Sequence, residues 1–121
     1  MMEKKTLVLG ASDNPERYSY LAVQKLKKFQ QPVVALGIKE SVIDGTPILT
    51  GKPELNDIHT VTLYLNAQRQ QQYYDYILSL HPKRIIFNPG AENEELYHLA
   101  KANGIEPVEA CTLVMLSTGL F

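Results

Sequence analysis

A short stretch near the amino end has the pattern of a buried strand that runs into a glycine turn: Thr6-Leu7-Val8-Leu9-Gly10-Ala11-Ser12. Its first four residues favour β-structure, and such an apolar run is typical of a strand buried on both faces of a parallel sheet. Gly10 permits a sharp turn where the strand ends, and residues 12–15 have loop chemistry. From Tyr18 onwards, apolar residues recur at helical spacing. Strand, glycine turn and helix are typical of the phosphate-binding opening of a doubly wound fold, where free N–H groups attract an anion.

Strands and helices alternate along the rest of the chain. We expect further strands at residues 33–36, 60–65, 84–87 and 106–110, a long loop over 38–51 and a short helix within 53–58. This alternation predicts an α/β fold, a Rossmann-like three-layer sandwich with a five-stranded, mainly parallel sheet. We expect the strand order 3-2-1-4-5. The switch point, and with it the ligand, would then lie at the carboxyl ends of strands 1 and 4.

Composition limits the classes of function. A chain of 121 residues suits a single domain, residues 1–121, with one core. The net charge of −1 offers no large basic field for nucleic acid or an anionic membrane. No apolar run approaches the roughly 20 residues that span a bilayer. The single cysteine, Cys111, cannot form an internal disulfide. We therefore expect a cytoplasmic protein that binds neither nucleic acid nor membrane.

Candidate ligand-binding residues follow four of the expected strands, where carboxyl ends converge on one edge of the sheet. They are Gly10, Ala11, Ser12 and Arg17 after the first strand, Gly37, Ile38 and Lys39 after the second, Leu65 and Asn66 after the third, and Asn88 and Gly90 after the fourth. The dinucleotide fingerprint is broken, because Ser12 stands at its second glycine position. NAD favours a carboxylate after the second strand, whereas Lys39 there suits a phosphorylated ribose. The pattern thus favours a phosphorylated nucleotide.

The chain resembles the stand-alone CoA-binding domain proteins, which are similar to the N-terminal domain of the succinyl-CoA synthetase alpha subunit. The resemblance covers nearly the whole chain and rests on Thr6 to Ser12 with Arg17 and Tyr20, the Gly45 turn, Asp57-Ile58, and Gly90-x-x-Asn93-Glu94. It implies a Rossmann-like domain that holds the adenine, ribose and phosphates of CoA along the ends of the first three strands. The chain departs from the family pattern at Gly37-Ile38 (commonly Asn-Pro), Asn66-Ala67 (often Pro-Pro) and Glu109-Ala110-Cys111 (usually Asp-Arg-Cys).

Several readings stay open at this point. Asn88 and Asn93 fit turn and cap positions as well as ligand contacts, and Cys111 fits a small buried hydrophobe better than a reactive thiol. The three histidines do not have the spacing of a metal site, and no nucleophile–base pair can be argued. We expect a module that binds CoA or an acyl-CoA as a carrier, sensor or regulator without chemistry of its own. The alternatives are a small enzyme or subunit of acyl-CoA metabolism that needs a partner, and an NAD-type dinucleotide module. A homodimer or another protein partner stays open.

Overall fold

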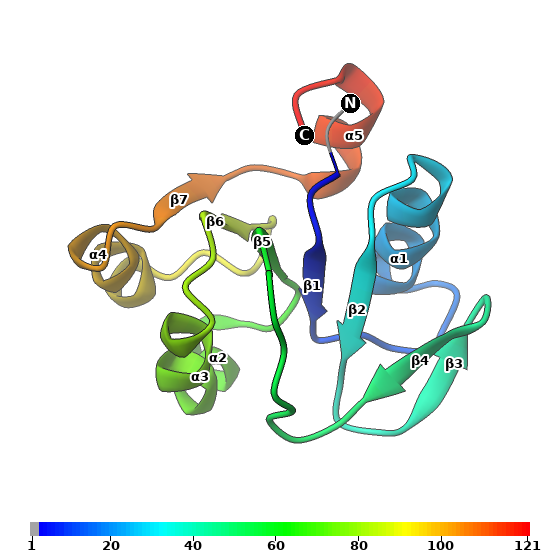
Figure 1. Ribbon diagram of the computed structural model, residues 1–121, viewed down its shortest axis with the longest axis horizontal. Coiled ribbons are helices and arrows are strands. Elements are labelled where there is room, and N and C mark those ends of the chain that lie inside the picture. Colours follow the sequence, from blue (N-terminus) through cyan, green and yellow to red (C-terminus); the bar gives the residue numbers. More distant parts are fainter. Residues whose placement is uncertain (1–2) are drawn as a thin grey trace.

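A seven-stranded sheet runs through the centre of the molecule, with helices on both of its faces (Figure 1). This computed structural model describes residues 3–121. The elements, in chain order, are β1 (Thr6–Leu9), α1 (Tyr18–Lys28), β2 (Val33–Leu36), β3 (Ser41–Ile43), β4 (Thr46–Leu49), β5 (Thr60–Leu63), α2 (Ala67–Gln70), the 3-10 helix η1 (Gln71–Tyr73), α3 (Tyr74–Ser79), β6 (Arg84–Phe87), α4 (Glu94–Ala102), β7 (Glu106–Glu109) and α5 (Thr112–Thr118).

The strands lie in the order β3-β4-β2-β1-β5-β6-β7, and only the β3–β4 pair is antiparallel. The Rossmann-like α/β prediction is correct, but the prediction of five strands is wrong. Residues 41–49 form a β-hairpin instead of a loop, and residues 53–58 are not helical. The hairpin turns at Asp44-Gly45, both with positive φ (46° and 82°), a dipeptide that favours two-residue hairpin turns.

The hairpin also changes the strand order. The strand at residues 60–63 lies between β1 and β6, whereas the predicted order placed it outside β2. The outer position belongs to β4, which pairs in parallel with β2. Numbered over the parallel strands alone, the order is 3-2-1-4-5-6, that of a doubly wound dinucleotide-type sheet. The switch point therefore lies between β1 and β5, not between β1 and the strand at 84–87.

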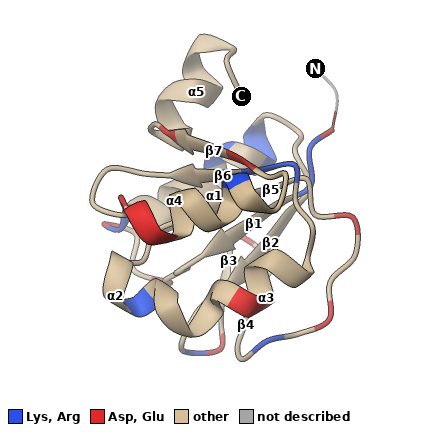
Figure 2. Cartoon of the chain, turned by 90° about the vertical axis from the view of Figure 1, so that its left-hand side faces the viewer, with Lys and Arg blue, Asp and Glu red and all other residues tan. Residues whose placement is uncertain are grey.

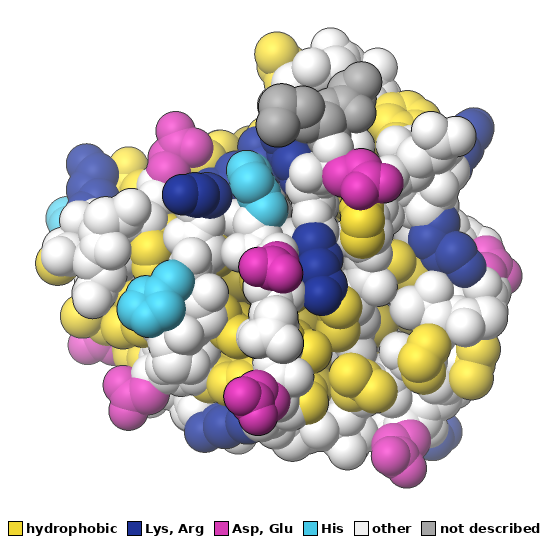
Figure 3. Space-filling view, in the orientation of Figure 1, with side chains coloured by type: hydrophobic (Ala, Val, Ile, Leu, Met, Phe, Trp, Pro, Cys, Tyr) yellow, Lys and Arg dark blue, Asp and Glu magenta, His cyan; other side chains and the backbone are white. Residues whose placement is uncertain are grey.

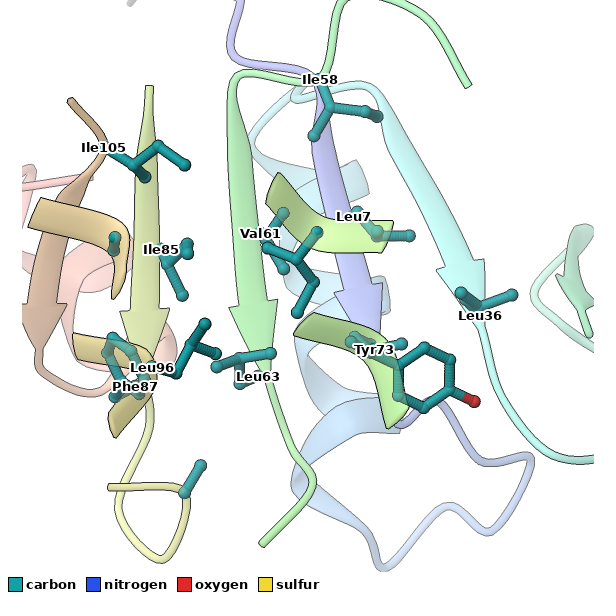
Figure 4. Packing of buried hydrophobic residues seen from close by; sticks show 14 residues of the cluster. Leu7, Leu36, Ile58, Val61, Leu63, Tyr73, Ile85, Phe87, Leu96 and Ile105 are labelled. Carbon is teal, nitrogen blue, oxygen red and sulfur yellow. The ribbon is translucent and has the colours of Figure 1, made fainter. Parts of the chain in front are cut away.

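Alternating side chains of the strands supply two separate cores. On one face, Leu7 joins Val61 and Leu63 beneath α3 and α4 (Figure 4), and Leu9 belongs to the same cluster. On the other face, Val8 joins Val23 and Leu26 of α1, and Met115 and Leu116 of α5. Every residue of β1, β5 and β6 is buried, as in strands covered on both faces, and the buried residues include polar side chains such as Thr60 and Thr62 of β5. Because helices cover both faces of the sheet, the loops that follow different strands come together at the carboxyl ends of the central strands.

Candidate functional site

A cleft of about 510 Å³ opens at the carboxyl ends of β1, β2, β5 and β6. Its walls come from loops that follow these four strands and from the amino end of α1. The lining residues are Gly10, Ala11, Ser12, Asp13, Arg17, Tyr18, Ser19, Ile38, Lys39, Tyr64, Leu65, Arg69, Pro89, Gly90 and Ala91. Eight of the residues predicted from the sequence are among them: Gly10, Ala11, Ser12, Arg17, Ile38, Lys39, Leu65 and Gly90. Gly37, Asn66 and Asn88 are not.

The loop after β1 forms the floor of the cleft. The N–H groups of Gly10 and Ala11 both donate to the carbonyl of Leu36, at 2.9 and 3.0 Å, which ties this loop to β2. Gly10 has φ +98°, and a Cβ there would lie 3.1 Å from the Leu65 side chain and from the Tyr64 carbonyl carbon. Glycine is therefore required both by the backbone and by packing. The turn delivers the chain to α1, whose amino end faces the cleft and favours negative charge.

Gly37 supports the cleft from below instead of lining it. A Cβ at this position would lie 2.4 Å from the carbonyl oxygen of Ala11, far inside van der Waals contact. The N–H of Gly37 donates to the Leu49 carbonyl at 2.8 Å, which continues the β2–β4 pairing. The glycine thus lets the loop after β1 cross the end of β2 at close range. Its position at the sheet edge was predicted correctly, but the structure gives it a packing role rather than a place in the cleft wall.

Three cationic side chains and one carboxylate line the cleft. Arg17 and Lys39 are exposed beside the loops after β1 and β2, and Arg69 is exposed on α2, where Figure 2 shows a basic segment. The carboxylate, Asp13, accepts a hydrogen bond from the Ser41 hydroxyl at 2.7 Å. The balance in the cleft is therefore cationic, although the whole chain is slightly acidic. Such a set of side chains favours an anionic ligand.

Arg69 was missed by the sequence analysis. The signal for it was the cap at Asn66, whose Oδ1 accepts a hydrogen bond from the Arg69 N–H at 2.9 Å. That bond fixes the start of a single helical turn at the carboxyl end of β5. Side chains of this turn therefore lie near the cleft. One of them, Arg69, adds a cation at a position where the sequence has no phosphate-binding motif.

Asn66 and Asn88 hold the walls and do not line them. Asn66 caps α2. Asn88 is 3% exposed, and its Nδ2 donates to Thr62 Oγ1 at 2.7 Å and to the Leu63 carbonyl at 2.8 Å. Its Oδ1 accepts from the Thr112 N–H at 2.9 Å. All of these groups of the Asn88 amide are occupied within the protein, so its role is to join β5, β6 and α5 under the cleft.

Tyr64 adds an aromatic wall between the loop after β1 and the loop after β6. Burial raises the pKa of its hydroxyl to about 12, so the side chain is neutral near pH 7. At the rim, Tyr18 and Ile38 are 70% and 84% exposed and add apolar surface. The cleft therefore combines cations with apolar surface, as an organic phosphate ester requires.

Within residues 3–121, no helix is long and apolar enough to cross a membrane. The same residues contain no group of three His, Cys, Asp or Glu side chains that could hold a metal ion.

Comparison with known families matches residues 4–117 to the CoA binding domain. The chain belongs to this family. The CoA-binding domain match therefore spans both the cleft-forming loops and the sheet that carries them. Curated proteins give no significant match.

Solved structures share the architecture of this CoA-binding domain. A crystal structure described as an uncharacterized protein is 50% identical, with each chain covered over 100% of its length and a TM-score of 0.98. A hypothetical protein from Pyrococcus horikoshii OT3 is 21% identical, with 98% of this chain and 85% of that chain covered and a TM-score of 0.88. A Thermus thermophilus protein described as cell-free ID.343 is 20% identical, with 98% and 91% covered and a TM-score of 0.83. The last two likenesses establish the fold alone.

Proposed function

We propose that the chain binds coenzyme A or an acyl-CoA in the cleft at the carboxyl ends of β1, β2, β5 and β6. The observation that carries this proposal is the meeting of a glycine turn, a helix amino end and three cations in one cleft of a CoA-binding domain. CoA has a diphosphate and a 3′-phosphate, so it presents more negative charge than NAD. A cation, Lys39, stands after β2, where NAD-binding sheets favour a carboxylate.

The order of the loops suggests how the ligand lies. The diphosphate fits beside Ser12 and the amino end of α1, since the N–H groups of Gly10 and Ala11 already donate to the Leu36 carbonyl. The adenosine half then extends over the end of β2, with the apolar side chain of Ile38 beside it and Lys39 toward the 3′-phosphate. The pantetheine arm extends the other way, over the ends of β5 and β6, past Leu65 and Gly90. This arrangement uses both sides of the switch point.

We further propose that the domain is a carrier, sensor or regulatory module. The side chains that line the cleft are suited to binding, since they include arginine, lysine, serine and tyrosine. The alternatives are a small enzyme or subunit that acts on acyl-CoA with a partner, and an NAD-type module. We also propose that the protein acts in the cytoplasm, as a homodimer or with another protein partner.

A ligand panel tests the binding proposal. The melting temperature of the protein is measured with CoA, acetyl-CoA, dephospho-CoA, NAD, NADP and ATP, and ligands that raise it are titrated by calorimetry. A ligand that binds only the folded state adds about 2.7 kcal/mol of stability at a concentration of 100 Kd. We expect CoA or acetyl-CoA to bind tightest. Tighter binding of NAD, or no binding of any CoA compound, would overturn the proposal.

A second assay separates the module from the enzyme. Acetyl-CoA is incubated with the protein, and free thiol is measured over time. We expect no release above the rate in buffer. Release proportional to protein concentration would favour the enzyme alternative.

A further inference from the structure

Gln70, the last residue of α2, lies between the two loops that form the β5–β6 side of the cleft. Its side chain is fully buried, at 0% exposure. Its Nε2 donates to the carbonyl of Leu65 at 2.7 Å and to the carbonyl of Ala91 at 2.8 Å. Leu65 follows β5, Ala91 follows β6, and both line the cleft. One amide therefore bridges the two walls with both of its hydrogens.

The remaining polar atom of Gln70 is also occupied. Its Oε1 accepts from Asn93 Nδ2 at 2.9 Å, and the same Nδ2 donates to the Tyr74 hydroxyl at 2.8 Å. Asn93 Oδ1 in turn caps α4 by accepting from the Leu96 N–H at 3.2 Å. The bridge is thus held in one orientation from below, because a flipped amide would place like groups against each other.

Beyond the ends of β5 and β6, backbone pairing does not connect the two loops within residues 3–121. The β5–β6 register ends at Leu63 and Phe87. Within residues 3–121, no backbone hydrogen bond joins residues 64–66 to residues 88–91. Next to the cleft, the Gln70 amide therefore joins the two loops, in addition to the contacts of Asn88 with Thr62 and Leu63 beneath them.

We infer that Gln70 is a positioning residue for the part of the ligand that lies beyond the diphosphate. The inference rests on the proposed binding of CoA, since the pantetheine arm is the part expected over β5 and β6. Loss of the bridge leaves the buried carbonyl of Ala91 and the partly buried carbonyl of Leu65 without this donor, and the walls separate to reach water. The loop of Gly10 to Ser12 is tied to Leu36 and should keep its place.

The test compares two ligands on two matched variants. Gln70→Met removes the bridge at similar side-chain size, and Gln71→Met makes the same change at the neighbouring exposed glutamine. Affinities are measured for CoA and for adenosine 3′,5′-bisphosphate, which carries only the nucleotide half. For Gln70→Met we expect CoA to bind about tenfold or more weakly, as for two lost hydrogen bonds. The bisphosphate should stay within about twofold, and Gln71→Met should change neither. Equal losses for both ligands would overturn the inference, because a general loss of structure acts on the whole cleft.

A measurement without ligand keeps the inference separate from the proposed function. Amide hydrogen exchange is compared between wild type and Gln70→Met. We expect faster exchange in residues 64–66 and 88–91, with β1 and β2 unchanged. Unchanged exchange in these loops would overturn the positioning role. Failure of the wild type to bind CoA would overturn the proposed function, and the exchange result would then decide the role of Gln70 alone.

Discussion

The two ends of the parallel sheet treat positive charge in opposite ways. At the carboxyl end, Arg17, Lys39 and Arg69 are exposed around an open cleft. At the amino end, Arg84 of β6 is only 8% exposed, and its guanidinium carbon lies 4.3 Å from the centre of the Phe121 ring. Lys4 donates to the Phe121 carbonyl oxygen at 2.6 Å and lies 5.8 Å from the same ring. At the carboxyl end the cations are exposed and can contact an anion. At the amino end an aromatic side chain covers these two cations.

The difference shows how one sheet separates binding from stability. Burial desolvates the guanidinium of Arg84 and thereby lowers its pKa, while the charge of Glu106 opposes the shift. Its Nε donates to Thr60 Oγ1 at 2.8 Å, while its Nη2 has no hydrogen-bond partner among residues 3–121. The Phe121 ring, itself 3% exposed, supplies a cation–π contact instead. Changes at the amino end should therefore alter the free energy of unfolding, and changes at the cleft should alter ligand affinity.

The largest expected effect is that of Phe121→Ala. Truncation of a buried phenylalanine costs about 3–5 kcal/mol of unfolding free energy, and here it also exposes Arg84. We expect a loss of this size in urea denaturation, with CoA affinity unchanged under conditions where the variant is folded. Leu120→Ala is the matched control, since Leu120 is 73% exposed and should change stability by less than about 0.5 kcal/mol. A fall in CoA affinity would break the separation of the two ends.

Gly37→Ala should lower both stability and ligand affinity, because Gly37 lies in the core and also supports the cleft. The added Cβ would meet the Ala11 oxygen at 2.4 Å, so the loop after β1 must shift. We expect a loss of about 1–3 kcal/mol in stability, as for overpacked sites, together with weaker CoA binding.

The control for this change is Gly51→Ala, where a Cβ meets open space but φ is +75°. The left-handed backbone makes this variant less stable by about 1–2 kcal/mol, with CoA affinity unchanged. Equal CoA affinities of the Gly37→Ala variant and the wild type would show that the loop after β1 is not part of the binding site.

Most of the central sheet could be predicted from the sequence, whereas the hairpin at its edge could not. The buried central strands were predicted because their residues are mainly apolar or β-branched, as in strands covered on both faces. The β3–β4 hairpin was missed because Val42 and Pro47 are exposed and only Ile43 and Ile48 are buried, so the segment has the composition of a loop. Its one clear signal, Asp44-Gly45, indicates a turn without saying what the turn joins. Without that hairpin, the third strand was assigned to the wrong side of the sheet.

At the cleft, the sequence could identify loop positions but not their roles. Residues that follow strands converge by topology alone, so most of the predicted positions line the cleft. Gly37 and Asn88 differ because their roles depend on tertiary contacts, to Ala11 and to Thr112, that no local pattern encodes. Gln70 was missed for the same reason, since nothing in the sequence distinguishes it from Gln71 and Gln72. The cation–π contact of Arg84 with Phe121 joins residues far apart in the chain and left no pattern either.

The cations of the cleft should give a smaller effect, confined to affinity. Lys39→Gln and Arg69→Gln each remove an exposed charge, and exposed contacts contribute up to about 1 kcal/mol, or about fivefold in affinity. We expect Lys39→Gln to weaken CoA more than dephospho-CoA, and Arg69→Gln to weaken both alike. Stability should change by less than about 0.5 kcal/mol. The losses should shrink as salt is added. Equal losses of CoA and dephospho-CoA in Lys39→Gln would show that Lys39 does not recognise the 3′-phosphate.

The smallest expected effect lies at the amino end and depends on pH. His59 Nδ1 lies 2.7 Å from Thr60 Oγ1, which also accepts the Nε–H of Arg84. The Thr60 hydroxyl can then donate its own proton only to a neutral His59. Burial lowers the pKa of His59 below 6.5, and the charges of Arg84, Lys4 and Lys83 lower it further. Figure 3 shows histidine and Lys or Arg side chains side by side near the top of this face.

The direction of the pH effect follows from these contacts. Because the folded pKa of His59 lies below the unfolded value, the unfolded chain binds the proton first as pH falls. Stability should therefore be complete above about pH 6.5 and decline as the pH falls from there toward the folded pKa. The urea midpoint of wild type, measured from pH 8 to pH 5, should fall more steeply than that of His59→Gln, which cannot titrate. The CoA affinity ratio of the two proteins should not vary over the same range, because the cleft lies at the other end of the sheet. Identical pH slopes for the two proteins would mean that the neutral His59–Thr60–Arg84 chain contributes nothing to stability. A pH-dependent affinity ratio would mean instead that the two ends of the sheet are coupled.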